Sequence, residues 1–110
     1  MSILGLDIGQ SGVKGVVFRE DGVPLFSLYK EFKMIFPQPG HIEIDSQSVC
    51  LAIKELIREL NSKAKGDPPS AVSIATFGES FVPIDNKGTI LSNIIVPGDS
   101  RSKELLFERI

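Results

Sequence analysis

The stretch GLDIGQSGVKGVVFREDG, residues 5–22, decides the fold. Apolar residues on both sides of Gly-Gln-Ser-Gly predict two strands, at 2–8 and 12–19, joined by a tight turn. The Asp-Gly pair that ends the stretch is a strong signal for a second tight turn, and a third strand is predicted at 23–34. Because parallel strands need a long crossover, these three strands must pair antiparallel. The first strand is nearly continuously apolar, which predicts that both its faces are covered.

A helix is predicted at about 46–64, after a Pro-Gln-Pro-Gly break. Asp45 and Ser46 are both suited to cap its N-terminus. Its apolar face is predicted to consist of Val49, Ile53, Leu56, Ile57 and Leu60. A buried strand is predicted at 71–77, and the helix is the crossover that lets this strand pair in parallel with the first one. Three antiparallel strands, a crossover helix and a parallel strand predict an α/β domain of the RNase H-like type, with a mixed sheet.

The second half of the chain predicts shorter elements. Strands are expected at 80–85 and 89–96, on either side of an Asn-Lys-Gly turn, and an amphipathic helix at 100–110. The apolar residues at helical spacing in that segment are Leu105, Leu106 and Ile110. Because the segment stops without a cap or a polar tail, we expect residues 1–110 to be the first part of a larger domain.

The composition excludes several classes of protein. Hydrophobic residues make up 42% of the chain and charged residues 24%, which is typical of a soluble globular protein. With 12 basic and 14 acidic side chains, the chain has no basic excess for nucleic acid or an anionic membrane. Its single cysteine, Cys50, cannot form an internal disulfide, and no Cys/His cluster suits a metal. We expect a cytoplasmic protein without nucleic-acid or membrane partners.

The first turn carries the residue types that a phosphate site needs. Glycine lets the backbone approach an oxyanion, and the N–H groups of Gly9, Gln10 and Ser11 can form an anion nest. Asp7 lies in an apolar strand, where a bare buried carboxylate is costly, so it needs a partner or an ion such as Mg²⁺. Lys14 would add a mobile positive charge. The alternative is a plain hairpin in which the glycines shape the turn and Lys14 is solvated.

Four segments, in the same order, resemble the FGGY carbohydrate kinases of the sugar kinase/actin/Hsp70 ATPase superfamily. LDIGQSGVKGVVFREDG resembles the first phosphate-binding motif of that family. PQPGHIEID at 37–45 is similar to Pro-Gly-Trp-x-Glu-x-Asp, and PGDSR at 97–101 resembles Trp-Asn-Asp-x-Arg. SIATFGESFVPID at 73–85 resembles the strand-turn-strand that presents substrate-contacting side chains. The resemblance spans essentially the whole chain, and it implies an RNase H-like (actin-like ATPase) fold and phosphoryl transfer from ATP, with Mg²⁺, to a sugar or polyol hydroxyl.

The resemblance also implies roles for individual residues of the first motif. Asp7 would serve Mg²⁺, and the ATP phosphates would be held by Gly9, Gln10, Ser11 and Lys14. Gln10 replaces the threonine usual in the family. The catalytic aspartate and the adenine-binding domain of the family come later in the chain. The resemblance therefore implies that residues 1–110 alone are catalytically inactive.

For the substrate site, the resemblance implies contacts with the sugar or polyol by Gly78, Glu79, Asp99 and Arg101. Gly78 replaces the arginine of glycerol-type members, which argues against glycerol. His41 stands where the second motif of the family has tryptophan, and Pro97 and Gly98 replace the Trp-Asn of the last motif. These departures suggest a divergent member with an altered substrate. The alternatives are a solvated turn acid at Glu79 and a helix cap with an ion pair for Asp99 and Arg101.

Two other functions fit the same pattern. The chain is compatible with a non-catalytic RNase H-like interaction module, or with a degenerate kinase that senses sugar. We expect Phe77 and Phe81 to belong to the core and not to stack on a sugar. Since later elements would cover the sheet of a full domain, we also expect residues 1–110 alone to expose apolar surface and strand edges, and to self-associate.

Overall fold

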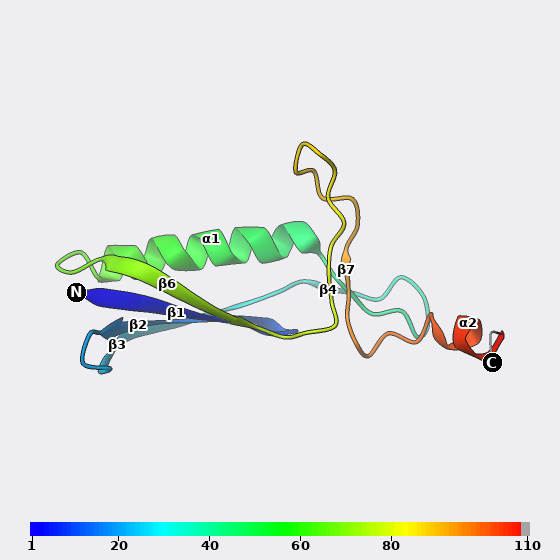
Figure 1. The fold of residues 1–110 in the computed structure, drawn as a ribbon, viewed down its shortest axis with the longest axis horizontal. Helices are drawn as coiled ribbons and strands as arrows, with labels where there is room; N and C mark the ends of the chain where they lie inside the picture. Colours follow the sequence, from blue (N-terminus) through cyan, green and yellow to red (C-terminus); the bar gives the residue numbers. More distant parts are fainter. Residues whose placement is uncertain (109–110) are drawn as a thin grey trace.

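The computed structural model describes residues 1–108, and its centre is a four-stranded mixed sheet (Figure 1). The strands of this sheet are β1 (Ser2–Ile8), β2 (Gly12–Arg19), β3 (Pro24–Glu31) and β6 (Pro69–Thr76). Their order is β3-β2-β1-β6. The first three pair antiparallel, whereas β6 pairs with β1 in parallel after the crossover helix α1 (Ser46–Lys63). The predicted topology is therefore confirmed.

Helix α1 begins at a side-chain cap. The carboxylate of Asp45 accepts hydrogen bonds from the backbone N–H groups of Gln47 at 3.0 Å and Ser48 at 3.2 Å, which otherwise have no partner in the first turn. Ser46 instead donates its hydroxyl to the carbonyl of Ser92 at 2.8 Å. Of the two predicted caps, Asp45 takes the role, and Ser46 ties the helix start to a distant segment.

The core lies between α1 and one face of the sheet. It consists mainly of Leu4, Leu6, Val13, Val17, Val49, Ala52, Leu56 and Leu60. Gly15 of β2 marks the closest approach, because a Cβ atom there would lie 2.7 Å from Leu60 Cδ1 and would also clash with Leu56. The predicted apolar face of the helix is confirmed, although Ile53 and Ile57 are only partly buried.

Two predictions of burial were wrong. The second face of β1 has no cover among the described residues, and β6 exposes Val72 by 55% and Ile74 by 60%. The reason is that the contacts of α1 with the sheet lie mainly on β2 and β3, whereas β6 is the strand at the opposite edge of the sheet from β3. The apolar run in β1 indicated burial correctly only for the face that the helix reaches, whereas β6 is exposed on both faces from Ser70 to Thr76.

A second, smaller sheet has the order β4-β5-β7 and is antiparallel throughout. Its strands are β4 (Met34–Ile35), β5 (Glu43–Ile44) and β7 (Ile94–Ile95). The third predicted strand therefore ends at Glu31, because residues 34–35 pair with β5 instead of continuing along β2. The strand expected at 80–85 does not form, and that at 89–96 is reduced to β7. Between β6 and β7 the chain projects from the body (Figure 1), with one isolated bridge between Ile84 and Ile90.

The chain ends in a short helix, α2 (Lys103–Glu108), which lies at the far end of the molecule from the start of β1 (Figure 1). The predicted helix at 100–110 is confirmed for this part, and Ile110 lies outside the described residues. The radius of gyration is 17.2 Å, against roughly 13 Å for a compact domain of this length. Among residues 1–108, no helix is long and apolar enough to cross a membrane.

Candidate functional site

The turn between β1 and β2 is closed by backbone hydrogen bonds. The N–H of Gly9 donates to the carbonyl of Gly12 at 2.9 Å, and the carbonyl of Ser11 accepts from Phe32 at 2.9 Å. The Ser11 hydroxyl lies 3.2 Å from that of Tyr29. Gln10 and Ser11 are exposed. The turn is thus anchored to β3, while its two central side chains face solvent.

A glycine is required at position 12 by the packing of the turn against β3. A Cβ atom at this position would lie 2.6 Å from Tyr29 Cζ and would also clash with the Lys30 carbonyl. Neither Gly9 nor Gly12 has a positive φ. The second glycine of the motif is therefore required by the close approach of β3, and not by a left-handed backbone in the turn.

Asp7 and Lys14 lie directly opposite each other on β1 and β2. Both side chains are exposed on the sheet face that α1 does not cover, and both line a shallow hollow of ≈ 300 Å³ with Phe18 and Ser73. The inference that Asp7 needs an ion because it is buried was wrong, since its side of β1 is open. Within residues 1–108, neither side chain has a hydrogen bond or an ion pair, so both are available to a ligand.

Asp7 suits one particular mode of magnesium binding. No group of three or more His, Cys, Asp or Glu residues suited to a metal occurs in the described part of the chain. A dedicated protein cage is therefore absent from it. Mg²⁺ usually keeps several waters and is held by one or two carboxylates together with substrate phosphates. One open carboxylate beside a candidate phosphate turn is consistent with that mode.

A second hollow, of ≈ 500 Å³, brings together Glu79, Asp99 and Arg101. Glu79 follows β6, whereas Asp99 and Arg101 precede α2, so two distant segments of the chain meet here. Glu79 has a φ of 67°, a left-handed conformation that is uncommon outside glycine and often occurs at ligand sites. Gly78, the fourth predicted contact, does not line this hollow.

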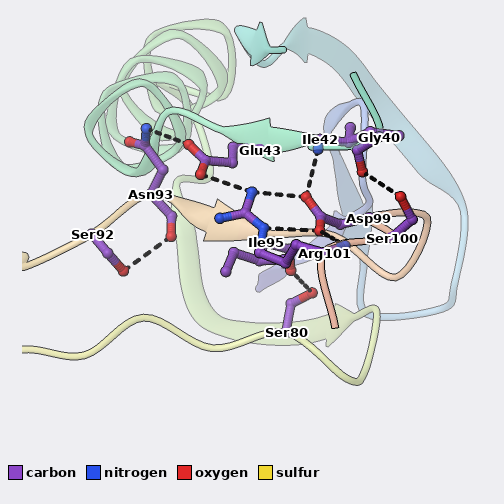
Figure 2. Close-up of polar contacts among 10 residues, drawn as sticks. All are labelled: Gly40, Ile42, Glu43, Ser80, Ser92, Asn93, Ile95, Asp99, Ser100 and Arg101. Atoms are coloured by element: carbon purple, nitrogen blue, oxygen red, sulfur yellow. Dashed lines mark hydrogen bonds and ion pairs between the residues drawn. The ribbon is translucent and has the colours of Figure 1, made fainter. Parts of the chain in front are cut away.

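Asp99 and Arg101 form the centre of a polar network (Figure 2). Arg101 donates from Nε to Asp99 Oδ1 at 2.8 Å and from Nη2 to Asp99 Oδ2 at 2.8 Å. Nη2 also donates to Glu43 Oε1 at 2.9 Å, and Asn93 Nδ2 donates to Glu43 Oε2 at 3.1 Å. The backbone N–H of Ile42 donates to Asp99 Oδ2 at 2.6 Å. The network therefore connects β5, the segment before β7 and the segment before α2.

The network shifts the ionisation of its members. Hydrogen bonds from Arg101 hold the pKa of Asp99 well below its usual range, against the opposing effect of desolvation. Hydrogen bonds from Asn93 and Arg101 lower the pKa of Glu43. The two carboxylates in turn raise the pKa of Arg101. At neutral pH the network holds two carboxylates and one guanidinium.

Sequence reasoning missed three residues of this region. Glu43 stood inside the PQPGHIEID motif without a role, and Asn93 had no signal in the sequence. Phe81 was expected in the core but is 84% exposed and lines the larger hollow, whereas Phe77 packs against the core as expected. The Glu-x-Asp spacing before the helix, which PQPGHIEID shares with the family motif, was the one signal that could have indicated Glu43.

The turn follows the end of β1, and a segment that lines the larger hollow follows the end of β6, which is the parallel neighbour of β1. β1 ends at Ile8 and β6 at Thr76, with these two residues in register. The carbonyl of Ile8 accepts a hydrogen bond from Phe77 at 3.2 Å. Since the carboxyl ends of parallel strands meet at one edge of a sheet, Gly9 and Gly78 start from the same edge.

A family model, that of the FGGY family of carbohydrate kinases, N-terminal domain, matches residues 2–108. The chain belongs to the FGGY family of carbohydrate kinases. This FGGY chain is 31% identical over 111 residues to a glycerol kinase of Stenotrophomonas maltophilia (strain R551-3), with 98% of the chain and 22% of that protein covered. It is 30% identical over 105 residues to a glycerol kinase of Gloeobacter violaceus, with 94% of the chain and 21% of that protein covered.

Solved structures agree with this membership. A ligand-bound xylulose kinase from Lactobacillus acidophilus superposes with a TM-score of 0.89 at 26% identity, with 97% of this chain and 22% of that chain covered. A Plasmodium falciparum glycerol kinase with ADP has a TM-score of 0.89 at 24% identity and shares the fold, with 98% and 22% covered. The FGGY chain therefore spans about a fifth of the length of these relatives.

Proposed function

We propose that this chain supplies the first phosphate-binding turn and part of the substrate site of an ATP-dependent sugar or polyol kinase. The observation that carries the proposal is the common sheet edge from which Gly9 and Gly78 start. Phosphoryl transfer needs the γ-phosphate and the accepting hydroxyl aligned at one place. A phosphate turn after β1 and an acidic loop after β6 would bring the two groups to the same sheet edge.

In this proposal the turn and its two neighbouring side chains bind the phosphates. Backbone N–H groups of Gln10 and Ser11 would face the oxyanions, and the ammonium of Lys14 would neutralise part of their charge. The N–H of Gly9 is already donated to the carbonyl of Gly12, so Gly9 would contribute by letting the backbone approach a phosphate closely. Asp7 would hold a phosphate-bound Mg²⁺, which supplies charge neutralisation when present. Because Asp7 and Lys14 have no internal partner within residues 1–108, no internal contact needs to break first.

The larger hollow would hold the sugar or polyol. The carboxylate of Glu79 is exposed and can accept hydrogen bonds from hydroxyl groups, while Arg101 can donate to a hydroxyl oxygen. Gly78 would contribute by leaving space beside Glu79, since nothing lies within 4 Å of a Cβ atom built there. The relatives named above include glycerol and xylulose kinases. The absence of an arginine at position 78 still argues against glycerol for this chain.

Calorimetric titration of the full-length gene product with Mg·ATP, and separately with a panel of polyols and sugars, tests the proposal. Lys14→Ala should weaken Mg·ATP binding and leave sugar binding unchanged, whereas Glu79→Gln should do the reverse. Glu20→Gln, a charge change at the opposite end of β2, is the matched control and should alter neither. The kinase proposal fails if no member of the panel is phosphorylated by the full-length protein with Mg·ATP. Sugar binding without turnover would favour the sensor.

A further inference from the structure

We propose that the Glu43–Arg101–Asp99 network makes the larger hollow selective for an uncharged polyol or sugar over a sugar acid or a sugar phosphate. This inference rests on the proposed function and names the substrate class of the same site. Its starting point is Arg101, a cation that lines the hollow. The guanidinium of Arg101 is already paired with two carboxylates, those of Asp99 and Glu43.

The network leaves one donor of Arg101 for a ligand. Nε and Nη2 are both committed to carboxylates, while Nη1 has no hydrogen bond to any other described residue (Figure 2). The oxygens of Asp99 each accept two internal hydrogen bonds, and its side chain is only 2% exposed. Glu43 is 16% exposed, with both oxygens occupied. A ligand therefore meets one guanidinium nitrogen and not the acids that hold it.

The charges of this region sum to an excess of negative charge. The charged residues that line the hollow are Glu79, Asp99 and Arg101, and Glu43 lies against Arg101 from the other side. Three carboxylates and one guanidinium leave two net negative charges. Like charges brought together at a partly desolvated site cost several kcal/mol. An anionic ligand would therefore be disfavoured even though the hollow contains an arginine.

A hydroxyl group suits both partners that remain available. The exposed carboxylate of Glu79 can only accept hydrogen bonds, and Nη1 of Arg101 can only donate them. A hydroxyl does both, so neighbouring hydroxyls of one polyol can satisfy the two side chains without carrying charge. Glu43 contacts Arg101 and Asn93 but does not itself line the hollow, so it acts as a positioning residue that fixes the guanidinium and sets its charge balance.

A pair of ligands that differ at one terminal carbon, which is a hydroxymethyl group in one and a carboxylate in the other, tests the inference. Xylitol and xylonate have the same number of carbons, and both are titrated calorimetrically into the full-length gene product. We expect xylitol to bind more than about tenfold more tightly, because the cost of like charge exceeds the 1.4 kcal/mol that corresponds to a factor of ten. Glu79→Gln and Glu43→Gln should each reduce this preference by improving xylonate binding, and Glu20→Gln should leave it unchanged.

Because Glu43→Gln can also affect folding, the exposed Glu79→Gln gives a second, independent readout. Equal or tighter binding of xylonate by the wild type would overturn the inference, as would an unchanged preference in Glu79→Gln. Mg·ATP binding and phosphorylation of some sugar, combined with a preference for xylonate, would contradict this inference and leave the proposed function standing. Failure of all ligands, Mg·ATP included, would overturn both.

Discussion

The guanidinium of Arg101 and the carboxylate of Asp99 form a two-pronged ion pair, with both N···O distances at 2.8 Å. Two residues apart in sequence, they also join through the backbone N–H of Arg101, which donates to Asp99 Oδ1 at 2.9 Å. Fork-to-fork pairs of this kind are among the stronger hydrogen-bonded ion pairs. Asp99 also accepts from the N–H of Ile42 and Arg101 also donates to Glu43, so the pair ties the segment before α2 to β5 and its ionisation should influence folding as well as binding.

Acid should destabilise the fold through this network. The pKa values of Asp99 and Glu43 are lower in the folded chain than their ordinary values, so the unfolded chain takes up protons first as the pH falls. Their stabilisation is complete above about pH 5 and is lost progressively below about pH 4. Urea unfolding followed from pH 7 to pH 3 should show this loss.

Asp99→Asn should flatten that dependence on pH and lower the unfolding midpoint at pH 7. Glu31→Gln removes an exposed carboxylate that has no ion pair among residues 1–108, and it serves as the control. An equal loss of stability on acidification in wild type and Asp99→Asn would contradict the prediction.

Gly15→Ala should destabilise the chain by about 1–3 kcal/mol, because the added methyl group would be forced against Leu56 and Leu60 in a packed core. Gly66→Ala is the matched control, since nothing lies within 4 Å of a Cβ atom there. Equilibrium unfolding of both variants measures the difference. A Gly15→Ala variant as stable as Gly66→Ala would show that helix and sheet do not pack as closely as described.

Leu56→Ala should cost about 2–5 kcal/mol in the free energy of unfolding, the range typical for removing a fully buried leucine from a core. Leu51→Ala lies on the same helix, where its side chain is 55% exposed, and it should change stability much less. Similar losses from the two substitutions would place the core on a different face of α1.

The purified chain of residues 1–110 should neither hydrolyse ATP nor phosphorylate sugars. Phosphoryl transfer needs a base for the attacking hydroxyl, and the resemblance to the family assigns that base, and the domain that binds adenine, to later segments. Coupled assays of ADP release, with the Asp7→Ala, Lys14→Ala double variant as background, measure this. Turnover above that background would contradict the prediction.

The same chain should self-associate through β6. Val72 and Ile74 are more than half exposed on a strand with one unpaired edge, and such edges pair readily with another strand. Sedimentation of wild type should show a concentration-dependent dimer, and Val72→Thr, Ile74→Thr should weaken it. Val23→Thr, an exposed position near the β2–β3 turn, is the control. A clean monomer at high concentration would refute the prediction.

Local patterns in the sequence predicted the long elements well. Turn residues between apolar runs set the hairpins of β1, β2 and β3, and a capping Asp45 with 3.6-residue periodicity set α1. The short strands were not predictable, because β4, β5 and β7 exist only through pairing between segments far apart in the chain. Two-residue strands have no periodicity of their own.

What the sequence by itself determined was the order and direction of the main strands and the residue types of the two candidate sites. Antiparallel pairing follows from short connections, and the parallel pair from the helical crossover. Only the tertiary structure decided which side chains are exposed and which hydrogen-bond and ion-pair partners they have. Asp7 is open because α1 covers the other face of β1, and Arg101 is shared between Asp99 and Glu43 because β5 lies beside the segment before α2. These properties depend on which faces meet in space, and a linear pattern does not contain that information.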